Sequence, residues 1–429
     1  MTGIDWRSKE NHLPWILFLS GLAIFISNVD LLSTGDTIYY ANIIDTLRLD
    51  QLTAHQGYYV FGLIVSTGLN FFSSVPTDQA LAYMSAVFGS AALTVGFLLA
   101  RHYLESTSYA LLTVLILFVC HRFFENSISA EVYIVQAFFL WLAILLFEKQ
   151  QFYVSGIALT FSFWVTPLTL PFCLWFAVSA YLRRIGVFPL LKTALPAVVL
   201  YGLFLIIFYE ELLWGNRGLL EQDEAREILF GEGLRSFGTY QFKHYTVLNL
   251  LFIPALFALK HYRYLAWTSL AIVLPNIYVI SQLRSEDNVF ILPLDIIFAI
   301  WIAIGFRFLI ARRLKYFALA ILILHAAVFI ALEDLFTRPS HASFANEIQE
   351  IGQLVKSKRS SLLFAKWSQR MAFVYFNRTE PSFPLEGGYW YSKSYDMGHI
   401  QQNDAKANDF AEYAPIYVLE TWGVSAHGK

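Results

Sequence analysis

Long apolar runs separated by short polar joints fill the first three quarters of the chain. They lie near 13–29, 57–73, 80–100, 108–121, 132–147, 152–164, 167–182, 187–209, 246–259, 264–282, 289–311 and 314–332. A straight membrane-spanning helix needs about 20 predominantly apolar residues, and several of these runs are shorter than that. The pattern predicts an all-α polytopic membrane protein. A helix break is expected at Thr166-Pro167, because proline disfavours helix in the residue before it.

Polar stretches of real length occur at 30–56, 210–245 and 333–429. In the last of these, apolar residues recur at helical spacing over 345–357, which predicts a short amphipathic helix. Residues 361–365 and 416–419 are apolar and predict strands. We therefore expect two parts: a multi-span domain over 1–332, and a small C-terminal α/β extracytoplasmic cap over 333–429.

Basic residues gather in short joints near 101, 149, 183–184, 260–263 and 312–315. Such joints remain on the cytoplasmic side of a membrane. These five joints follow every second apolar run from the third to the eleventh, so all five can lie on the cytoplasmic side. The remaining joints then lie outside. The loop 30–56 fits this parity only if runs 57–73 and 80–100 make one net crossing. The prediction is about 11 transmembrane helices, with the N-terminus inside and the tail outside.

Composition further narrows the class of protein and its expected partners. Hydrophobic residues make up 57% of the 429 and charged residues 14%, with a formal net charge of −2. Without a basic field, nucleic acid is not an expected partner. The two cysteines, Cys120 and Cys173, lie inside apolar runs, which excludes a disulfide framework or a zinc cluster. The first run lacks a small-residue cleavage site and reads as a signal anchor, which suits a multi-pass protein of a cell inner membrane.

Three ionisable residues stand at predicted lipid boundaries on the outer side: Asp36, His55 and Glu131. Charged groups near a bilayer are costly, so each is a functional candidate. Each also has a plainer interpretation. Asp36 can cap the helix that it opens, His55 can be a polar anchor, and Glu131 can mark the start of a span.

Cations on the outer side are a second group of candidates. Arg284 precedes the last-but-one apolar run, and its planar guanidinium suits a phosphate; a local ion pair with Glu286 or Asp287 is the alternative. Lys243 and His244 end the loop 210–245 and are further phosphate candidates. The chain has no Walker loop, no GxSxG and no HExxH, so a cytoplasmic nucleotide site is not expected.

Three short segments together resemble a known pattern: Gly35-Asp36, His55-Gln56-Gly57-Tyr58 and Ala130-Glu131-Val132-Tyr133. In order and spacing they resemble the GT-C superfamily of membrane glycosyltransferases, and within it the protein O-mannosyltransferase-like group. The resemblance covers residues 10–180 by motif and the rest by layout, with Arg284 and Leu292-Pro293 similar to the superfamily's final core span. Gln56 departs from the pattern, since the family has proline there.

The resemblance implies a polyprenyl-phosphate sugar donor used on the outer face, with a protein, lipid or glycan acceptor. It implies that Asp36 is the general base, that Glu131 orients the acceptor or shares that role, and that His55, Tyr58 and Tyr133 bind substrate. Arg284, or a bound divalent metal ion, would stabilise the leaving phosphate. A polytopic transporter or lipid-linked saccharide flippase is the rival class; it should show internal symmetry between its halves.

Overall fold

The computed structural model describes residues 12–29, 35–47, 55–207, 230–282, 288–333, 349–350, 361–364 and 416–419. Two compact units divide the chain. The first comprises Met1–Val29 and Leu47–Thr337, and the second comprises Asp30–Thr46 and Arg338–Lys429. The segment around Asp36 therefore belongs to the same unit as the C-terminal residues.

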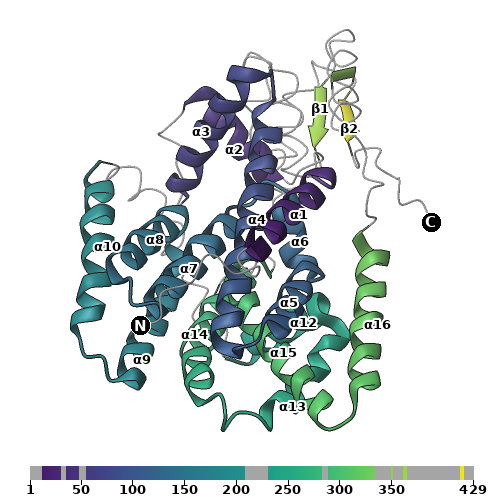
Figure 1. Cartoon of the computed structure of the whole chain (residues 1–429). Helices are drawn as coiled ribbons and strands as arrows, with labels where there is room; N and C mark the ends of the chain where they lie inside the picture. The colour runs from purple at the N-terminus through teal and green to yellow at the C-terminus, as the bar shows by residue number, and fades with distance from the viewer. Residues whose placement is uncertain are drawn as a thin grey trace. The chain divides into compact units, whose positions relative to one another are not determined.

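The first unit is helical throughout its described part (Figure 1). Its elements are α1 (Leu13–Ser27), α3 (Gln56–Phe72), α4 (Thr77–Leu104), α5 (Thr107–Phe118), α6 (His121–Ile128), α7 (Val132–Glu148), α8 (Phe152–Val165), η3 (Pro167–Phe172), α9 (Cys173–Arg183), α10 (Phe188–Ile207), α12 (Phe230–Tyr245), η5 (Thr246–Leu251), α13 (Phe252–Leu256), α14 (Arg263–Gln282), η6 (Asn288–Leu294), α15 (Asp295–Ala311) and α16 (Lys315–Glu333). All twelve predicted apolar runs coincide with helices to within a few residues. Three helices lie in segments that the apolar pattern left between runs: α6, α12 and, in the second unit, α2 (Gly35–Thr46).

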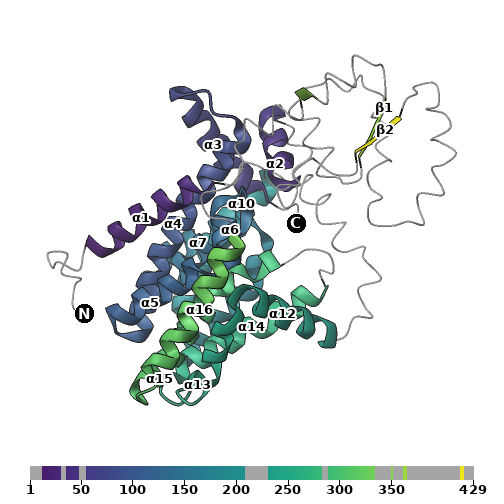
Figure 2. The same cartoon turned by 90° about the vertical axis from the view of Figure 1, so that its right-hand side faces the viewer.

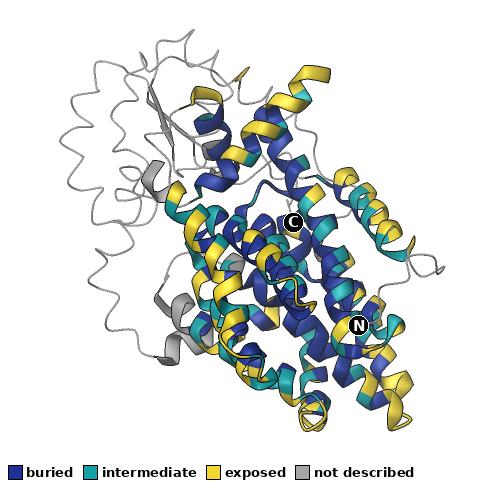
Figure 3. Cartoon of the chain, turned by 60° about the vertical axis from the view of Figure 1, so that its left-hand side comes forward, coloured by how far each residue is buried: buried dark blue, intermediate teal, exposed yellow. Residues whose placement is uncertain are grey.

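The core of this unit is built around α4, α7 and α15. Helix α4 packs against α1, α3, α5, α6 and α7, while α15 packs against α5, α13 and α16. Figure 3 shows these central helices as largely buried, and the indole nitrogen of Trp141 on α7 donates to the Pro293 carbonyl oxygen at 2.8 Å. This bond ties α7 to η6, the short helix that leads into α15.

Peripheral helices present apolar side chains outward. Leu195 and Val198 on α10 are 56% and 69% exposed, and Phe317 and Ile323 on α16 are 57% and 59% exposed. These two helices lie on opposite sides of the first unit (Figures 1 and 2). Lipid tails can cover such faces without cost, because the helices satisfy their own backbone hydrogen bonds.

Within the described residues, two helical stretches are long and apolar enough to cross a membrane: Thr77–Leu104 and Phe290–Ala311. The pair α5 and α6, bent by 69° at a short break, makes a third if it counts as one span. Five further apolar helices are shorter, between 10 and 17 residues. The structure thus supports apolar multi-helix architecture, and the count of about 11 crossings stays a prediction.

The sequence also predicts the helix break at Thr166-Pro167, and the structure confirms it. Thr166 is extended, with φ −162° and ψ 137°, and η3 begins at Pro167. The Thr166 hydroxyl oxygen accepts a hydrogen bond from the Leu168 N–H. The hydroxyl thus satisfies one of the backbone donors that the break leaves without a helical partner.

The second unit contains α2 (Gly35–Thr46) and two strands, β1 (Ser361–Phe364) and β2 (Ile416–Leu419). The strands pair in parallel, with Ser361 opposite Ile416 and Phe364 opposite Leu419. Both predicted strands and the predicted helix at Asp36 are therefore present. The helix predicted over 345–357 lies mostly outside the described residues, and the α/β cap as a domain over 333–429 stays a prediction.

Candidate active site

His55 and Tyr133, two of the residues singled out in the sequence, are brought together by the fold. His55 precedes α3, and its Nδ1 donates to the Val165 carbonyl oxygen at 3.0 Å. Its ring lies edge-to-face with that of Tyr133 in the first turn of α7, at 6.3 Å between centroids. Tyr133 in turn packs edge-to-face on Phe290 of η6, at 5.1 Å. This cluster joins the N-terminal ends of α3 and α7 to η6 and the C-terminal end of α8.

The chemistry of His55 follows from these contacts. A carbonyl oxygen only accepts, so the proton of the neutral ring is on Nδ1 and Nε2 is the acceptor atom. Burial lowers the pKa of His55, and the bond to the Val165 carbonyl opposes that shift. The residue is therefore held as a neutral, oriented imidazole.

Tight backbone packing fixes the start of α3. A Cβ added to Gly57 would lie 2.7 Å from both the carbonyl carbon and the Cβ of Trp164 on α8. Tyr58, the next residue, is fully buried, and its N–H donates to the His55 carbonyl oxygen at 2.9 Å. Glycine is needed at position 57 because no side chain fits between the two helices.

Glu131 immediately precedes α7 in extended conformation and does not cap that helix with its side chain. Its N–H donates to the Ser85 hydroxyl oxygen of α4 at 3.3 Å, and the residue is partly buried. Its position two residues before Tyr133 places Glu131 on the same side of the unit as the His55 cluster.

The remaining predicted residues divide into two groups. Asp36 lies in the first turn of α2, in the second unit, and its side chain lies outside the described residues, as does Arg284. Lys243 and His244 end α12: Lys243 is exposed, whereas His244 is 2% exposed and stacks on His121 of α6, with 5.4 Å between centroids. Convergence of Asp36 and Arg284 with His55 and Glu131 stays a prediction.

Arg122 and Asp295 form a buried ion pair that the sequence reading missed. Arg122 Nε donates to Asp295 Oδ2 at 3.0 Å and Nη2 donates to Oδ1. The Tyr245 hydroxyl donates to Oδ1 at 2.9 Å. The pair fastens α6 and α12 to the start of α15. The sequence signal that could have found it is the lone carboxylate inside the run 289–311, because a charge there needs a partner.

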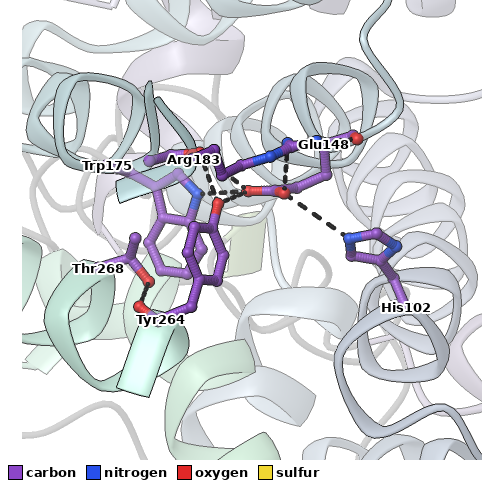
Figure 4. Close-up of polar contacts among 7 residues, drawn as sticks. His102, Glu148, Trp175, Arg183, Tyr264 and Thr268 are labelled. Atoms are coloured by element: carbon purple, nitrogen blue, oxygen red, sulfur yellow. Dashed lines mark hydrogen bonds and ion pairs between the residues drawn. The ribbon is translucent and has the colours of Figure 1, made fainter. Parts of the chain in front are cut away.

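Glu148 is the centre of a second missed network (Figure 4). Its carboxylate, 2% exposed, accepts from Tyr264 OH at 2.5 Å, from Arg183 Nη1 at 3.0 Å and from Trp175 Nε1 at 3.4 Å. His102 lies 3.6 Å away. Helix α7 has 17 residues, so Glu148 lies about 25 Å from Glu131 along its axis. The network therefore belongs to the end of the bundle opposite the His55 cluster.

A resident metal ion is not indicated by the described residues, which contain no group of three or more His, Cys, Asp or Glu able to hold one. Cys120 and Cys173 are both free thiols. The divalent ion considered at the leaving phosphate stays a prediction.

Comparison with known proteins identifies the fold but no sequence family. No protein-family model and no curated protein matches the chain. Among solved structures, ArnT from Cupriavidus metallidurans bound to undecaprenyl phosphate superposes with a TM-score of 0.59 at 11% identity, over 86% of this chain and 85% of that one. The Archaeoglobus fulgidus oligosaccharyltransferase in its apo form superposes with a TM-score of 0.55 at 15% identity, over 96% of this chain and 70% of that one.

A third solved structure agrees with these two. The archaeal oligosaccharyltransferase AglB, in complex with an inhibitory peptide and a dolichol-phosphate, gives a TM-score of 0.50 at 12% identity. The match covers 86% of this chain and 64% of that one. At these identities the likeness is one of fold, which this chain shares with ArnT and with the two archaeal oligosaccharyltransferase structures.

Proposed function

We propose that the chain is an integral membrane glycosyltransferase, which transfers a sugar from a polyprenyl-phosphate donor to an acceptor hydroxyl on the extracytoplasmic face of a cell inner membrane. One observation carries the proposal: the fold matches, over 86% of the chain, a structure with undecaprenyl phosphate bound. The two oligosaccharyltransferases support the same class. The narrower likeness to the protein O-mannosyltransferase-like group rests on the motifs alone.

The reaction needs a base, a leaving-group stabiliser and contacts to the sugar. In the proposed step, the acceptor oxygen attacks the anomeric carbon and a carboxylate takes the hydroxyl proton. The bond from that carbon to the phosphate oxygen breaks, with its electron pair going to the phosphate. Direct displacement inverts the anomeric centre. Asp36 is the proposed base, with Glu131 orienting the acceptor or sharing that role.

The other candidates take the remaining roles. Arg284 and the exposed Lys243 are proposed to stabilise negative charge on the leaving phosphate. His55 supports a binding role through its geometry, because the hydrogen bond from Nδ1 to the Val165 carbonyl oxygen fixes the orientation of its ring. Tyr133 and Tyr58 support the same site, Tyr133 by its ring contact with His55 and Tyr58 by fixing the backbone at the start of α3.

The test is a transfer assay with the purified chain in vesicles. A panel of radiolabelled polyprenyl-phosphate sugars is supplied with protein, lipid and glycan acceptors, and products are separated by chromatography. Transfer of label with inversion at the anomeric carbon supports the proposal. Movement of the labelled lipid between leaflets without any transfer would replace it with the flippase reading.

A further inference from the structure

Among the residues that the structure describes, two buried side chains on one face of α12 carry polar atoms without hydrogen-bond partners. Gln241 and His244 are three residues apart, so they lie on the same side of the helix. They are 9% and 2% exposed. Within the described part of the chain, both side-chain atoms of Gln241 and both ring nitrogens of His244 lack a partner. Four such atoms in adjacent side chains are unusual, because buried polar groups in native proteins are almost always paired.

Helix α6 closes one side of this group. The His244 ring stacks on that of His121 with 14° between their planes. His121 is 22% exposed, and its Nε2 lies 3.4 Å from the Glu125 carboxylate. The stack therefore extends from a partly exposed histidine to a buried one, and the carboxylate of Glu125 holds the outer ring in place.

The protonation state of His244 restricts the chemistry of a ligand. Burial, followed by the nearby charge of Arg122, lowers the pKa of His244, so its ring is neutral. A neutral imidazole offers one N–H donor and one acceptor nitrogen, and the side-chain amide of Gln241 offers two N–H donors and an acceptor oxygen. Hydroxyl groups also donate and accept, whereas a phosphate dianion only accepts and would leave the acceptor atoms unpaired.

We propose that Gln241 and His244 bind hydroxyl groups of a sugar, with the ring of His121 as one wall of the site. This assigns His244 to sugar rather than phosphate recognition and leaves Lys243 as the phosphate candidate on α12. The proposal rests on the proposed function, and the sugar belongs either to the lipid-linked donor or to a glycan acceptor.

Two shape-conserving variants test the site: His244→Phe keeps the ring stack, and Gln241→Met keeps chain length and volume. Phe242→Leu, at a side chain 65% exposed on the same helix, is the control. The probes are undecaprenyl phosphate and undecaprenyl-phosphoryl hexoses, read by the shift in unfolding temperature, together with KM for a glycan acceptor in the transfer assay.

Wild type and the control should be stabilised more by the sugar-bearing lipid than by the bare lipid. Both variants should lose that extra shift while keeping the shift from undecaprenyl phosphate, which identifies the donor sugar as the ligand. If the site binds the glycan acceptor instead, both variants should keep the extra shift from the sugar-bearing lipid, and their KM for the glycan should rise roughly 10-fold. That rise is expected for the loss of one or two hydrogen bonds. Without ligand, the variants should unfold at the same or a higher temperature, because they remove unpaired buried atoms.

The proposal is overturned if both variants keep the extra shift and the wild-type KM. A fall in unfolding temperature with equal loss of the bare-lipid shift would also overturn it, since the two residues would then be structural. Should His244→Phe fail to fold, Gln241→Met decides the matter alone. Wild type that makes no product and responds to no lipid would instead refute the proposed function and remove the basis of this site.

Discussion

Arg122 donates two hydrogen bonds to the carboxylate of Asp295, which lies 173 residues later in the chain, and both side chains are buried. The pair is 1% and 0% exposed, so neither charge can find water if its partner is removed. Because Asp295 opens α15 and Arg122 lies in the first turn of α6, the pair sets the position of α6 beside the candidate site.

Removing either charge alone should destabilise the protein strongly. Asp295→Asn leaves the guanidinium of Arg122 buried without its counter-charge, a change that costs ~3–5 kcal/mol of unfolding free energy. Arg122→Met leaves the carboxylate of Asp295 buried without its counter-charge and should cost a similar amount. The double variant Arg122→Met/Asp295→Leu leaves no unpaired charge and should recover much of the loss. Thermal unfolding in detergent measures the stability of all three variants. A double variant no more stable than the less stable of the two single variants would contradict this account.

The fold and the site differ in how far the sequence determines them. Helix positions were predictable because each apolar run marks a segment that is buried or faces lipid. The break at Thr166-Pro167 was predictable because proline restricts the backbone of the residue directly before it. Helices α6 and α12 were missed, since their polar residues interrupt the apolar pattern, although α6 is largely buried and α12 buries Gln241, His244 and Tyr245. The pairing of Arg122 with Asp295 is tertiary: it follows from how α6 meets α15, which no local pattern encodes.

Glu148 illustrates a different limit. At the end of an apolar run it looks like an ordinary boundary charge, and only packing of α4, α9 and α14 around it shows that it is buried. By contrast, the motifs that contain His55 and Tyr133 marked both residues as substrate-binding candidates on the same predicted side of the membrane, although the contact between their rings was not itself predicted.

Substitution at Gly57 tests the close approach of α3 to α8. Gly57→Ala places a methyl group 2.7 Å from backbone and side-chain carbons of Trp164, so the helices must separate. Overpacking of this kind costs about 1–3 kcal/mol. Since His55 lies two residues earlier, its bond to the Val165 carbonyl should weaken and transfer activity should fall. Unfolding temperature and kcat/KM are the measurements.

Gly68, on the same helix, is the matched control. A Cβ there meets nothing within 4 Å, and the residue is exposed. Gly68→Ala should leave activity unchanged and raise the unfolding free energy by up to about 1 kcal/mol, because alanine loses less backbone entropy in a helix. Equal effects of the two substitutions would show that the Trp164 contact is not what makes position 57 special.

The Glu148 network should govern stability and not chemistry. Glu148→Gln keeps the shape but turns one acceptor oxygen into a donor facing Arg183 or the Tyr264 hydroxyl, leaving buried groups mismatched. An unsatisfied buried group costs about 1–3 kcal/mol, so the unfolding temperature should fall. Because the residue lies at the far end of α7 from Glu131, kcat per folded molecule should be unchanged.

His102 provides the comparison within that network. Its side chain is 40% exposed and lies 3.6 Å from the carboxylate, so His102→Gln should change the unfolding free energy by under about 1 kcal/mol. Loss of transfer by Glu148→Gln at a wild-type unfolding temperature would be the contrary result, and would give this end of the bundle a direct part in the reaction.

Asp36→Asn is the sharpest test of the proposed mechanism. Asp36 lies in the first turn of α2, and two roles fit that position: general base for the acceptor hydroxyl, or helix capping. Asparagine caps helices about as well as aspartate, so the capping role predicts almost no effect on stability or activity. It cannot accept the proton, so the catalytic role predicts transfer slower by ~10²–10⁴-fold in protein that folds and still binds undecaprenyl phosphate.

Glu131→Gln run in parallel completes the comparison. If Glu131 only orients the acceptor, this variant should raise KM for the acceptor more than it lowers kcat, since the amide retains an acceptor oxygen at the same place. The pH dependence of kcat separates the two residues further: the acidic limb of the profile, which reports protonation of the base, should vanish in the residual activity of Asp36→Asn and persist in Glu131→Gln. Full activity of Asp36→Asn, with the acidic limb lost in Glu131→Gln instead, would make Glu131 the base.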